Sequence, residues 1–434
     1  MRDDIGGGRL HVATAAAVAC LALGLYWPAT SAWFFQDDLQ WLAGTLTFKP
    51  GDLLAVNAQQ HFYRPVISLY FWAATPLFGG SPVLFHWANN VLHAGNAVLV
   101  LLLASRIGLK LAFACMAAVF FLAMPAHIEA TAWVSALAEP VTTFFGIIAV
   151  LGHLRRNGNG ALLWRGISIA AFCLALMTHE SAVVLLPLLV LADWAFLSTP
   201  SSASFLGRWM QRFWRFMPYF VALAIYLLVD LSVNSRSYLI EEGHYRFGLH
   251  AVPNLLGYVV TLYAGKRNLQ SFIVVVVVLA ALLLRGTPRV IFATAWLVLA
   301  ILPFSFFTWS NTSRYAYMPA VGMALLITEG LSWLDAQLQR RVPRNVRLAI
   351  SGLLGVFVAV RFVLFAAENI RNFTEGTERY RRFAIAARER DPQPAPGATL
   401  SADPDTVDQL HHRYLEALIQ WEFKDPTLKL AARP

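Results

Sequence analysis

Residues 10–41 read LHVATAAAVACLALGLYWPATSAWFFQDDLQW, and this stretch joins a membrane-length apolar segment to two adjacent carboxylates. Its first part, residues 10–29, carries no Asp, Glu, Lys or Arg, and about 20 mostly apolar residues suffice for a helix to cross the hydrocarbon core. Asp37 and Asp38 follow, between aromatic residues that include Trp33 and Trp41. The stretch therefore predicts a first membrane span with a pair of acids at the lipid–water boundary.

The composition of the whole chain is that of a polytopic membrane protein. Of 434 residues, 58% are hydrophobic and only 14% are charged, which lies outside the usual range of soluble domains. Apolar segments of spanning length recur and predict an all-α fold with about eleven transmembrane helices. The predicted spans are residues 10–29, 83–105, 109–125, 139–154, 163–178, 181–198, 214–233, 270–285, 288–307, 315–334 and 347–366.

Two further apolar segments are too short to count as spans. Residues 66–78 would form a helix of about 20 Å, which is shorter than the hydrocarbon core of about 30 Å. Residues 252–264 are similarly short and are entered through Pro253. We expect both to be interfacial helices in outer loops, and a re-entrant hairpin is the alternative for the second.

The basic residues predict the orientation of the chain, because Lys and Arg concentrate in cytoplasmic loops. They gather in alternate connections between spans, so Met1 is predicted to lie inside. The tail and the three loops that hold Asp37, Glu129 and Glu180 are predicted to lie outside. These inner loops account for much of the net charge of +9, so the charge gives no reason to expect nucleic-acid binding. We expect a bacterial inner (plasma) membrane protein whose outer acids face the periplasm.

The organisation predicted is a membrane domain over residues 1–366 and a small outer helical tail over residues 367–434. Within the tail, the Pro-rich stretch 391–397 breaks any helix, and residues 407–423 place apolar side chains on one face. The tail is either a solvated extension that packs on the outer loops or a partner-binding module.

Polar side chains share one face of the second predicted span. His86, Asn89, Asn90, His93 and Asn96 follow one another at helical spacing. Polar groups inside a membrane usually face a partner or a cavity. This face therefore either makes hydrogen bonds between helices, which is common in membrane bundles, or lines an entrance for a sugar or phosphate.

The second and third outer loops each carry a histidine beside a carboxylate. His127 and Glu129 stand two residues apart next to Trp133, and His179 and Glu180 are adjacent between two spans. The His-x-Glu spacing alone is a weak metal motif. The common side of these loops is more informative, because it allows the acids to converge.

The ordered motifs together resemble the C-type (GT-C) membrane glycosyltransferases. The resemblance is strongest to bacterial relatives of the protein O-mannosyltransferases and of the tetratricopeptide-containing mannosyltransferases. It covers residues 30 to 330 and rests on Asp37-Asp38, Tyr63-Arg64-Pro65, the stretch from Phe85 to Asn96, the stretch from Pro125 to Glu129, His179-Glu180 with Pro187, and Ser313-Arg314-Tyr315 with Tyr317 and Pro319. The chain differs in carrying His179 where the family commonly has lysine, and in lacking a repeat array.

The resemblance implies a donor sugar, mannose or a similar hexose, carried on a polyprenyl phosphate. The sugar would be transferred with inversion, on the outer face, to a hydroxyl of a glycan, lipid or protein acceptor. It also implies Asp37 as the general base that takes the proton of the attacking hydroxyl. Membrane lipid is the surrounding partner, and no cofactor is firmly implied.

Further roles follow from charge. A phosphate leaving group needs cations, and Arg314 and Arg64 are the first candidates, with Arg246 third. Asp38 and Glu129 either orient the donor or hold a divalent metal that neutralises the phosphate. The candidate substrate-binding residues are His127, His93, His179, Glu180 and Tyr315.

The competing interpretation is a polytopic transporter or flippase for a lipid-linked or glycan substrate, in which intramembrane His and Asn residues line a route. Such proteins usually show paired halves, and the sequence shows no internal repetition. Gly6-Gly7-Gly8 precedes the first span without a strand before it, so a nucleotide site is not supported. A scaffold that has lost its activity is a third alternative, although the outer acids are present.

Overall fold

The computed structural model describes residues 2–53, 62–156, 160–197, 205–234, 238–264, 268–284, 286–309, 312–339 and 341–432. Within these ranges the α-helices are α1 (Arg2–Tyr26), α2 (Asp37–Gly44), α3 (Pro65–Phe78), α4 (Pro82–Arg106), α5 (Leu111–Ala123), α6 (His127–Ala132), α7 (Ala138–Leu154), α8 (Ala161–Leu176), α9 (Leu185–Leu197), α10 (Phe205–Asn234), α11 (Tyr238–Glu241), α12 (Ala251–Ala264), α13 (Leu269–Leu283), α14 (Pro288–Ser305), α15 (Pro319–Leu338), α16 (Arg344–Arg390), α17 (Pro404–Leu410) and α18 (His412–Phe423). Short 3-10 helices are η1 (Trp27–Ser31), η2 (Pro50–Leu53), η3 (Val134–Leu137), η4 (Glu180–Val184) and η5 (Ser313–Ala316), and the strands are β1 (Thr399–Ala402) and β2 (Lys429–Ala432).

The helices confirm the predicted all-α polytopic class, with a two-stranded parallel sheet as the one addition in the described chain. In that part of the chain, seven segments are long and apolar enough to cross a membrane: Leu10–Ser31, Pro82–Arg106, Val134–Leu154, Glu180–Leu197, Met210–Val233, Pro288–Ser305 and Arg344–Arg390. The count of eleven is not confirmed. The predicted spans at 109–125, 163–178 and 270–285 correspond to the shorter helices α5, α8 and α13, and α15 is not among the seven.

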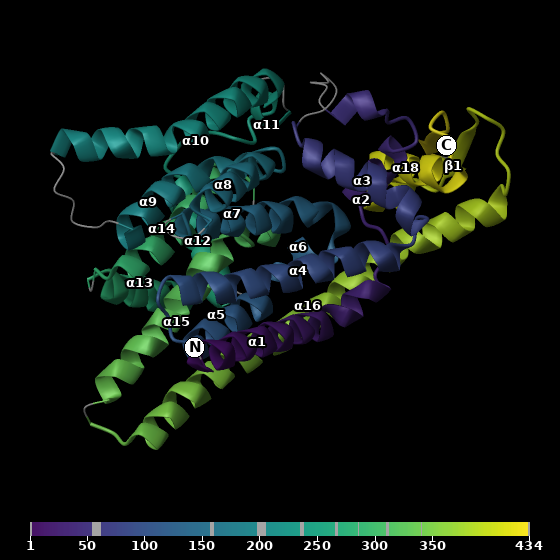
Figure 1. Ribbon diagram of the computed structural model, residues 1–434. Helices are drawn as coiled ribbons and strands as arrows, with labels where there is room; N and C mark the ends of the chain where they lie inside the picture. The colour runs from purple at the N-terminus through teal and green to yellow at the C-terminus, as the bar shows by residue number, and fades with distance from the viewer. Residues whose placement is uncertain are drawn as a thin grey trace.

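The bundle is built around α4, which contacts α1, α5 and α7 (Figure 1). Helix α5 is apolar on every side, as expected for a helix surrounded by others. Helices α14 and α15 cross closely at Gly322, where an added Cβ would lie 2.5 Å from the Ala293 carbonyl oxygen. Glycine is therefore required at this crossing, since any side chain would separate the two helices.

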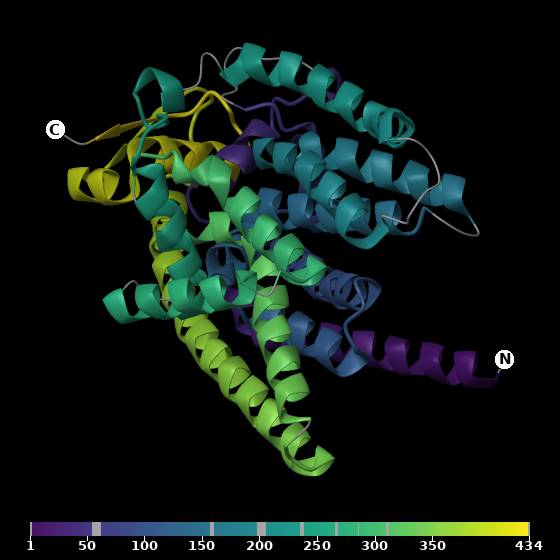
Figure 2. The same ribbon diagram turned by 90° about the vertical axis from the view of Figure 1, so that its left-hand side faces the viewer.

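Helix α16 connects the bundle to the tail. Its 47 residues correspond to roughly 70 Å at 1.5 Å per residue, and Figure 2 shows it extending from the far end of the bundle to the tail. The helix continues without interruption through residue 366, the predicted domain boundary, and ends at Arg390, where the Pro-rich stretch begins. The tail then folds as β1, α17, α18 and β2, with β1 and β2 paired in parallel.

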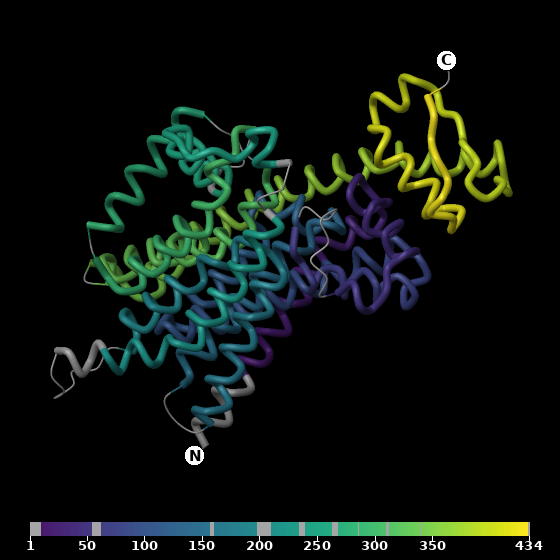
Figure 3. Tube along the Cα trace, turned by 90° about the horizontal axis from the view of Figure 1, so that it is seen from above, coloured from purple at the N-terminus to yellow at the C-terminus, as the bar shows by residue number. Residues whose placement is uncertain are grey.

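The tail packs on the segments that flank the first acid pair. Figure 3 shows it beside the part of the chain that includes α2 and α3. One hydrophobic cluster joins Leu39 and Leu42 of α2 to Leu415 and Leu418 of α18. At the end of α3, Gly80 has φ +75°, and an added Cβ would lie 2.9 Å from the Trp421 ring. Shared burial and this close approach fix the tail against the loop.

The two short apolar segments form the helices α3 and α12. Helix α12 buries Tyr258, Val259 and Val260 and packs against α14. The position of both helices relative to the membrane surface stays a prediction.

Buried ion pairs lie at the ends of the helices that are remote from the acid loops. The Asp193 carboxylate, 2% exposed, pairs with Arg156 and with Arg215, whose guanidinium lies 3.1 Å away. Asp335 pairs with Arg347 at 3.1 Å. Arg156, Arg215 and Arg347, which lie in or next to the predicted inner loops, thus stabilise that end of the bundle.

Candidate active site

The Asp37–Asp38 loop turns sharply before α2. Gln36 has φ 44° and ψ −111°, and both acids fall in the first turn of the helix, where the helix dipole favours negative charge. Asp38 is fully buried and accepts hydrogen bonds from the backbone N–H of Phe35 at 2.9 Å and of Ser135 at 2.6 Å. Asp38 therefore ties the loop to the segment before α7, whereas Asp37 is only half-buried.

The pKa of Asp38 predicts a pH dependence of stability. Burial raises this pKa from 3.8 to about 7. The hydrogen bonds from Phe35 and Ser135 act to lower the pKa, and the charge of Asp37 acts to raise it. Between about pH 4 and pH 7 the folded state thus retains a proton that the unfolded state releases, so rising pH destabilises the fold. We expect the thermal midpoint in lipid nanodiscs to fall more steeply between about pH 4 and pH 7 in wild type than in Asp38→Asn. Parallel slopes would contradict this assignment.

Glu129, in the short helix α6, holds Arg314. Its carboxylate accepts hydrogen bonds from the Arg314 guanidinium at 2.6 Å, from the Arg314 backbone N–H at 3.0 Å and from the Ser313 hydroxyl at 2.7 Å. The guanidinium also lies 4.9 Å from the centroid of the Trp133 ring, and the Trp133 indole donates to the Phe35 carbonyl at 3.0 Å. Arg314 is thereby placed next to the loop that carries Asp37.

A second arginine–glutamate pair joins the first outer loop to the third. The Arg64 guanidinium donates to both Glu180 oxygens, with Nη2 2.8 Å from Oε1 and Nε 3.1 Å from Oε2. A backbone hydrogen bond from Val66 to Met177 at 3.1 Å holds the two segments together. This two-point geometry fixes the orientation of the guanidinium plane.

His179 lies beside this pair as a neutral imidazole. Its Nε2 is 3.0 Å from Nη2 of Arg64 and 3.3 Å from Oε1 of Glu139. Burial lowers the pKa of His179 to about 3, and the positive charge of Arg64 also lowers it, although Glu180 acts to raise it. The ring therefore contributes hydrogen bonds and not charge at neutral pH.

Aromatic rings connect the two arginines. Phe304 stacks on Tyr315 with ring centroids 4.2 Å apart, and its ring centroid is 5.9 Å from that of His179. Tyr315 in turn lies 4.8 Å below the Arg314 guanidinium. The Arg64 and Arg314 clusters thus form one continuous layer at the same end of the bundle.

His93 and His127 lie behind this layer and are fully buried. The His93 ring is 2.7 Å from the Tyr317 hydroxyl, and the His127 ring packs on Tyr317 with centroids 4.4 Å apart. Asn96 donates to the same hydroxyl at 3.1 Å. Both histidines support the η5 segment that carries Arg314, and neither faces open space.

The remaining polar residues of α4 connect helices. Asn89 donates to the carbonyls of Thr131 and Trp133, and Asn90 donates to that of Tyr26 at 2.9 Å. Their side chains are at most 1% exposed. The observed contacts favour interhelical hydrogen bonding over a polar wall that lines an entrance.

Arg246, the third phosphate candidate, belongs to neither of the two ion-paired clusters described above. Its side chain is exposed, and its backbone N–H donates to the Phe306 carbonyl at 3.1 Å, next to the bridge between Tyr245 and Phe307. These contacts place Arg246 on a surface segment that precedes α12.

The predicted metal ligands do not fit a cation. Both Asp38 oxygens accept backbone hydrogen bonds, and Glu129 is paired with Arg314. Within the described ranges, His, Cys, Asp and Glu form no group of three or more that is placed to hold a metal ion.

Comparison with known proteins shows which fold this is. No family model matches the chain. The archaeal oligosaccharyltransferase AglB from Archaeoglobus fulgidus, in complex with an inhibitory peptide and a dolichol-phosphate, is similar over 94% of this chain and 60% of its own, with a TM-score of 0.54 and 12% identity. ArnT from Cupriavidus metallidurans, bound to undecaprenyl phosphate, is similar over 98% of this chain and 86% of its own, with a TM-score of 0.50 and 14% identity. The chain has the GT-C fold. This confirms the fold expected from the ordered motifs.

The sequence relatives agree with the GT-C assignment. The protein O-mannosyl-transferase TMTC3 of Mus musculus is 25% identical over 189 residues, which are 40% of this chain and 20% of TMTC3. The human protein O-mannosyl-transferase TMTC4 is 29% identical over 164 residues and 22% of its length. The chain thus matches about a fifth of these relatives.

One residue of this candidate site was missed at the level of sequence. Glu139 is 2% exposed at the start of α7, and neither of its oxygens accepts a hydrogen bond from the described residues. A carboxylate at the outer end of a predicted span was the available signal. Packing of the tail on the outer loops was one of the two predicted alternatives, but no local pattern indicates that its contact is with the Asp37 loop.

Proposed function

We propose that this protein transfers a hexose, mannose or a similar sugar, from a polyprenyl-phosphate donor to a hydroxyl acceptor, with inversion at the anomeric carbon. One observation carries the proposal: Asp37, the Glu129–Arg314 pair and the Arg64–Glu180 pair gather at one end of a GT-C bundle. The lipid phosphates bound by AglB and ArnT support a donor of this kind.

Asp37 is proposed as the general base. It is half-buried at the start of α2, while the neighbouring Asp38 is fully buried and bonded to the backbone. A base must come within hydrogen-bond reach of the attacking hydroxyl, and of these two acids only Asp37 has an exposed face. Asp38 instead holds the turn in place.

Arg314 and Arg64 are proposed to bind the donor phosphate. The leaving phosphate is already anionic and needs positive charge, which guanidinium groups supply with fixed geometry. Glu129 and Glu180 hold the two guanidinium groups in position. The side chains of Arg314 and Arg64 remain 24% and 19% exposed. No step of this mechanism uses a metal.

The test is transfer of radiolabelled sugar by purified protein in lipid, with a panel of polyprenyl-phosphate sugars and of hydroxyl acceptors. Labelled product, or labelled free sugar released to water, would support the transferase. Movement of an intact lipid-linked sugar across the bilayer, without cleavage, would contradict it and favour the transporter or flippase. We also propose that the protein lies in the bacterial inner membrane with its active site on the outer face. Protease protection of the tail tests this orientation.

A further inference from the structure

The tail brings its own polar side chains next to the Asp37 loop. Gln36 and the residues from His411 to Tyr414 line a cavity of about 420 Å³. Gln36 directly precedes the proposed base, and His411, His412 and Arg413 are exposed. Every one of these lining side chains can hydrogen-bond, and two or three of them can carry positive charge.

Backbone strain is concentrated at this cavity. Among the described residues other than glycine, positive φ values occur at Gln36 (44°), His411 (65°) and Lys424 (56°). The first two line the cavity, one from the N-cap of α2 and one from the N-cap of α18. Strained non-glycine residues cluster at active sites and ligand clamps, where the surrounding structure holds them in place.

Tyr414 links this segment to Asp37. Its side chain is 5% exposed, and burial together with the charge and hydrogen bond of Asp37 raises the pKa of Tyr414 to about 12. The Arg413 guanidinium donates to the Tyr414 hydroxyl at 2.5 Å. The Tyr380 hydroxyl of α16 donates to the Leu410 carbonyl at 3.2 Å. The segment from Leu410 to Tyr414 is thus fixed on both sides.

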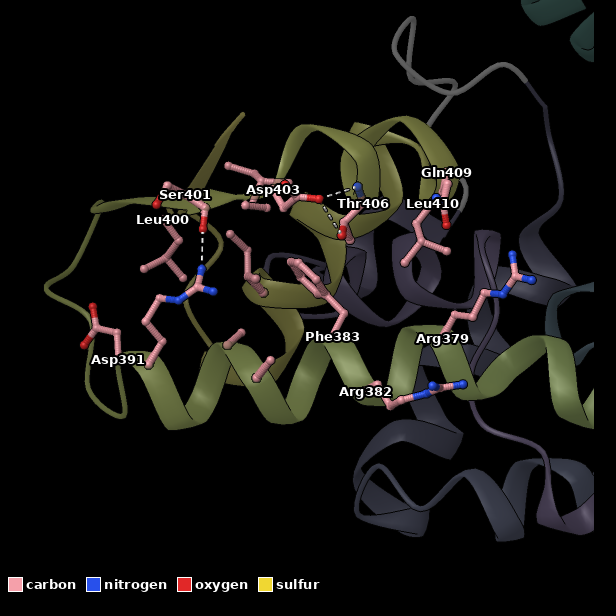
Figure 4. Close-up of a pocket in the computed structure, with 16 residues that line it drawn as sticks. Arg379, Arg382, Phe383, Asp391, Leu400, Ser401, Asp403, Thr406, Gln409 and Leu410 are labelled. Atoms are coloured by element: carbon pink, nitrogen blue, oxygen red, sulfur yellow. Dashed lines mark hydrogen bonds between the residues drawn. The ribbon is translucent and has the colours of Figure 1, made fainter. Parts of the chain in front are cut away.

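A basic groove continues from this segment into the tail. It has a volume of about 540 Å³ and lies between α16 and the strand β1 with α17 (Figure 4). Arg379 and Arg382 of α16 line it, as does Gln409, which directly precedes Leu410. Two acids also line the groove, and Asp403 is engaged in capping α17 through the Thr406 N–H at 3.2 Å. Basic side chains thus lie along α16 in the groove beside the segment that ends at Leu410.

Resting on the proposed transferase function, we propose that the cavity is the acceptor subsite and that it takes a saccharide acceptor carrying a carboxylate or a phosphate. His411, His412 and Arg413 determine this preference. A guanidinium recognises carboxylate and phosphate through paired hydrogen bonds, while Gln36 and the imidazoles bind sugar hydroxyls. Tyr414 lines the cavity and hydrogen-bonds with Asp37, so an acceptor held there has a hydroxyl near the proposed base.

The test compares acceptors that share the same sugar. The probes are propyl β-glucoside, propyl β-glucuronide and a phosphorylated propyl glucoside, with a serine-containing acidic peptide, each at saturating donor. We expect the wild type to show an acceptor KM at least about tenfold lower for an anionic glucoside than for the neutral one, the size of effect typical of one charge-assisted hydrogen bond. The two anionic probes distinguish carboxylate from phosphate recognition.

Arg413→Gln should remove most of this preference, and Arg381→Gln should keep it. Arg381 is a matched control, because it is an exposed arginine on α16 that pairs with Glu378 at 3.2 Å and does not line either cavity. Equal KM values for neutral and anionic glucosides, an unchanged preference in Arg413→Gln, or preferred use of the peptide would each overturn the proposal. Release of sugar to water in the absence of any acceptor reports the donor side alone. If the wild type releases no sugar to water and transfers none to any acceptor, the proposed function is overturned; if it cleaves the donor but shows no anionic preference, only the acceptor assignment is overturned.

Discussion

Replacing Asp37 by asparagine is expected to lower the rate of sugar transfer by about 10²- to 10⁴-fold, the usual contribution of a general base. The substitution keeps the shape of the side chain and removes its ability to take a proton. Asp38 cannot take over, because both of its oxygens accept backbone hydrogen bonds and the side chain is fully buried. The measurement is the single-turnover rate of labelled product formation with saturating donor and acceptor.

Asp52→Asn is the control for this substitution. Asp52 is an exposed acid that follows α2, and its carboxylate accepts only a local hydrogen bond from the Lys49 N–H at 2.8 Å among the contacts described for it. We expect wild-type rates in this variant. Full activity in a correctly inserted Asp37→Asn protein would show that the base is another group, and Glu129 would then be the next to test.

Replacing Arg314 by alanine is expected to lower kcat/KM for the lipid donor by about 10²- to 10³-fold, which is typical for loss of one preorganised charge at a developing anion. The guanidinium is held in one position by Glu129, Trp133 and Tyr315. Arg314→Lys should recover only part of the loss, because an ammonium cannot reproduce the planar two-point geometry. Steady-state kinetics with varied donor measure this directly.

Arg289→Ala provides a matched comparison. Arg289 also pairs with a glutamate, Glu329, but near the start of α14, at the end of the bundle remote from Asp37. Its loss should lower stability without changing the donor KM. If both variants lose stability and keep the donor KM, Arg314 has a structural role and the phosphate binds elsewhere.

Local sequence patterns predicted which residues belong to this candidate site better than they predicted which of those residues form ion pairs. Asp37, Arg64, Glu129, His179, Glu180 and Arg314 were all selected as candidates, and the described contacts bring the last five into two ion-paired clusters. The partners of each pair are 116 and 185 residues apart. Sidedness indicated that these loops meet, but which arginine faces which glutamate depends on helix packing that no short motif encodes.

For the tail, the sequence predicted neither the continuous helix that leads into it nor the particular loop on which it packs. The change from apolar to charged composition near residue 366 resembles a domain boundary. Helix α16 nevertheless runs through it, because strong helix formers lie on both sides and the helix tolerates Gly352, Gly355 and Gly376. The apolar face at 407–423 was visible in the sequence. Its partner was not, because the Leu39 and Leu42 side chains that it covers lie at the other end of the chain.

The contact between α16 and the Asp37 loop can form only late in synthesis of the chain. The Trp33 N–H donates to the Thr377 hydroxyl at 2.9 Å across 344 residues, and at about 5–20 residues per second a ribosome needs roughly 20–70 s to cover that distance. The first helix is therefore in the membrane long before the loop after it acquires its final support. Membrane insertion of the first helix therefore precedes completion of the site. A chain released early would be inserted in the bilayer but would lack the contact of α16 with the Asp37 loop.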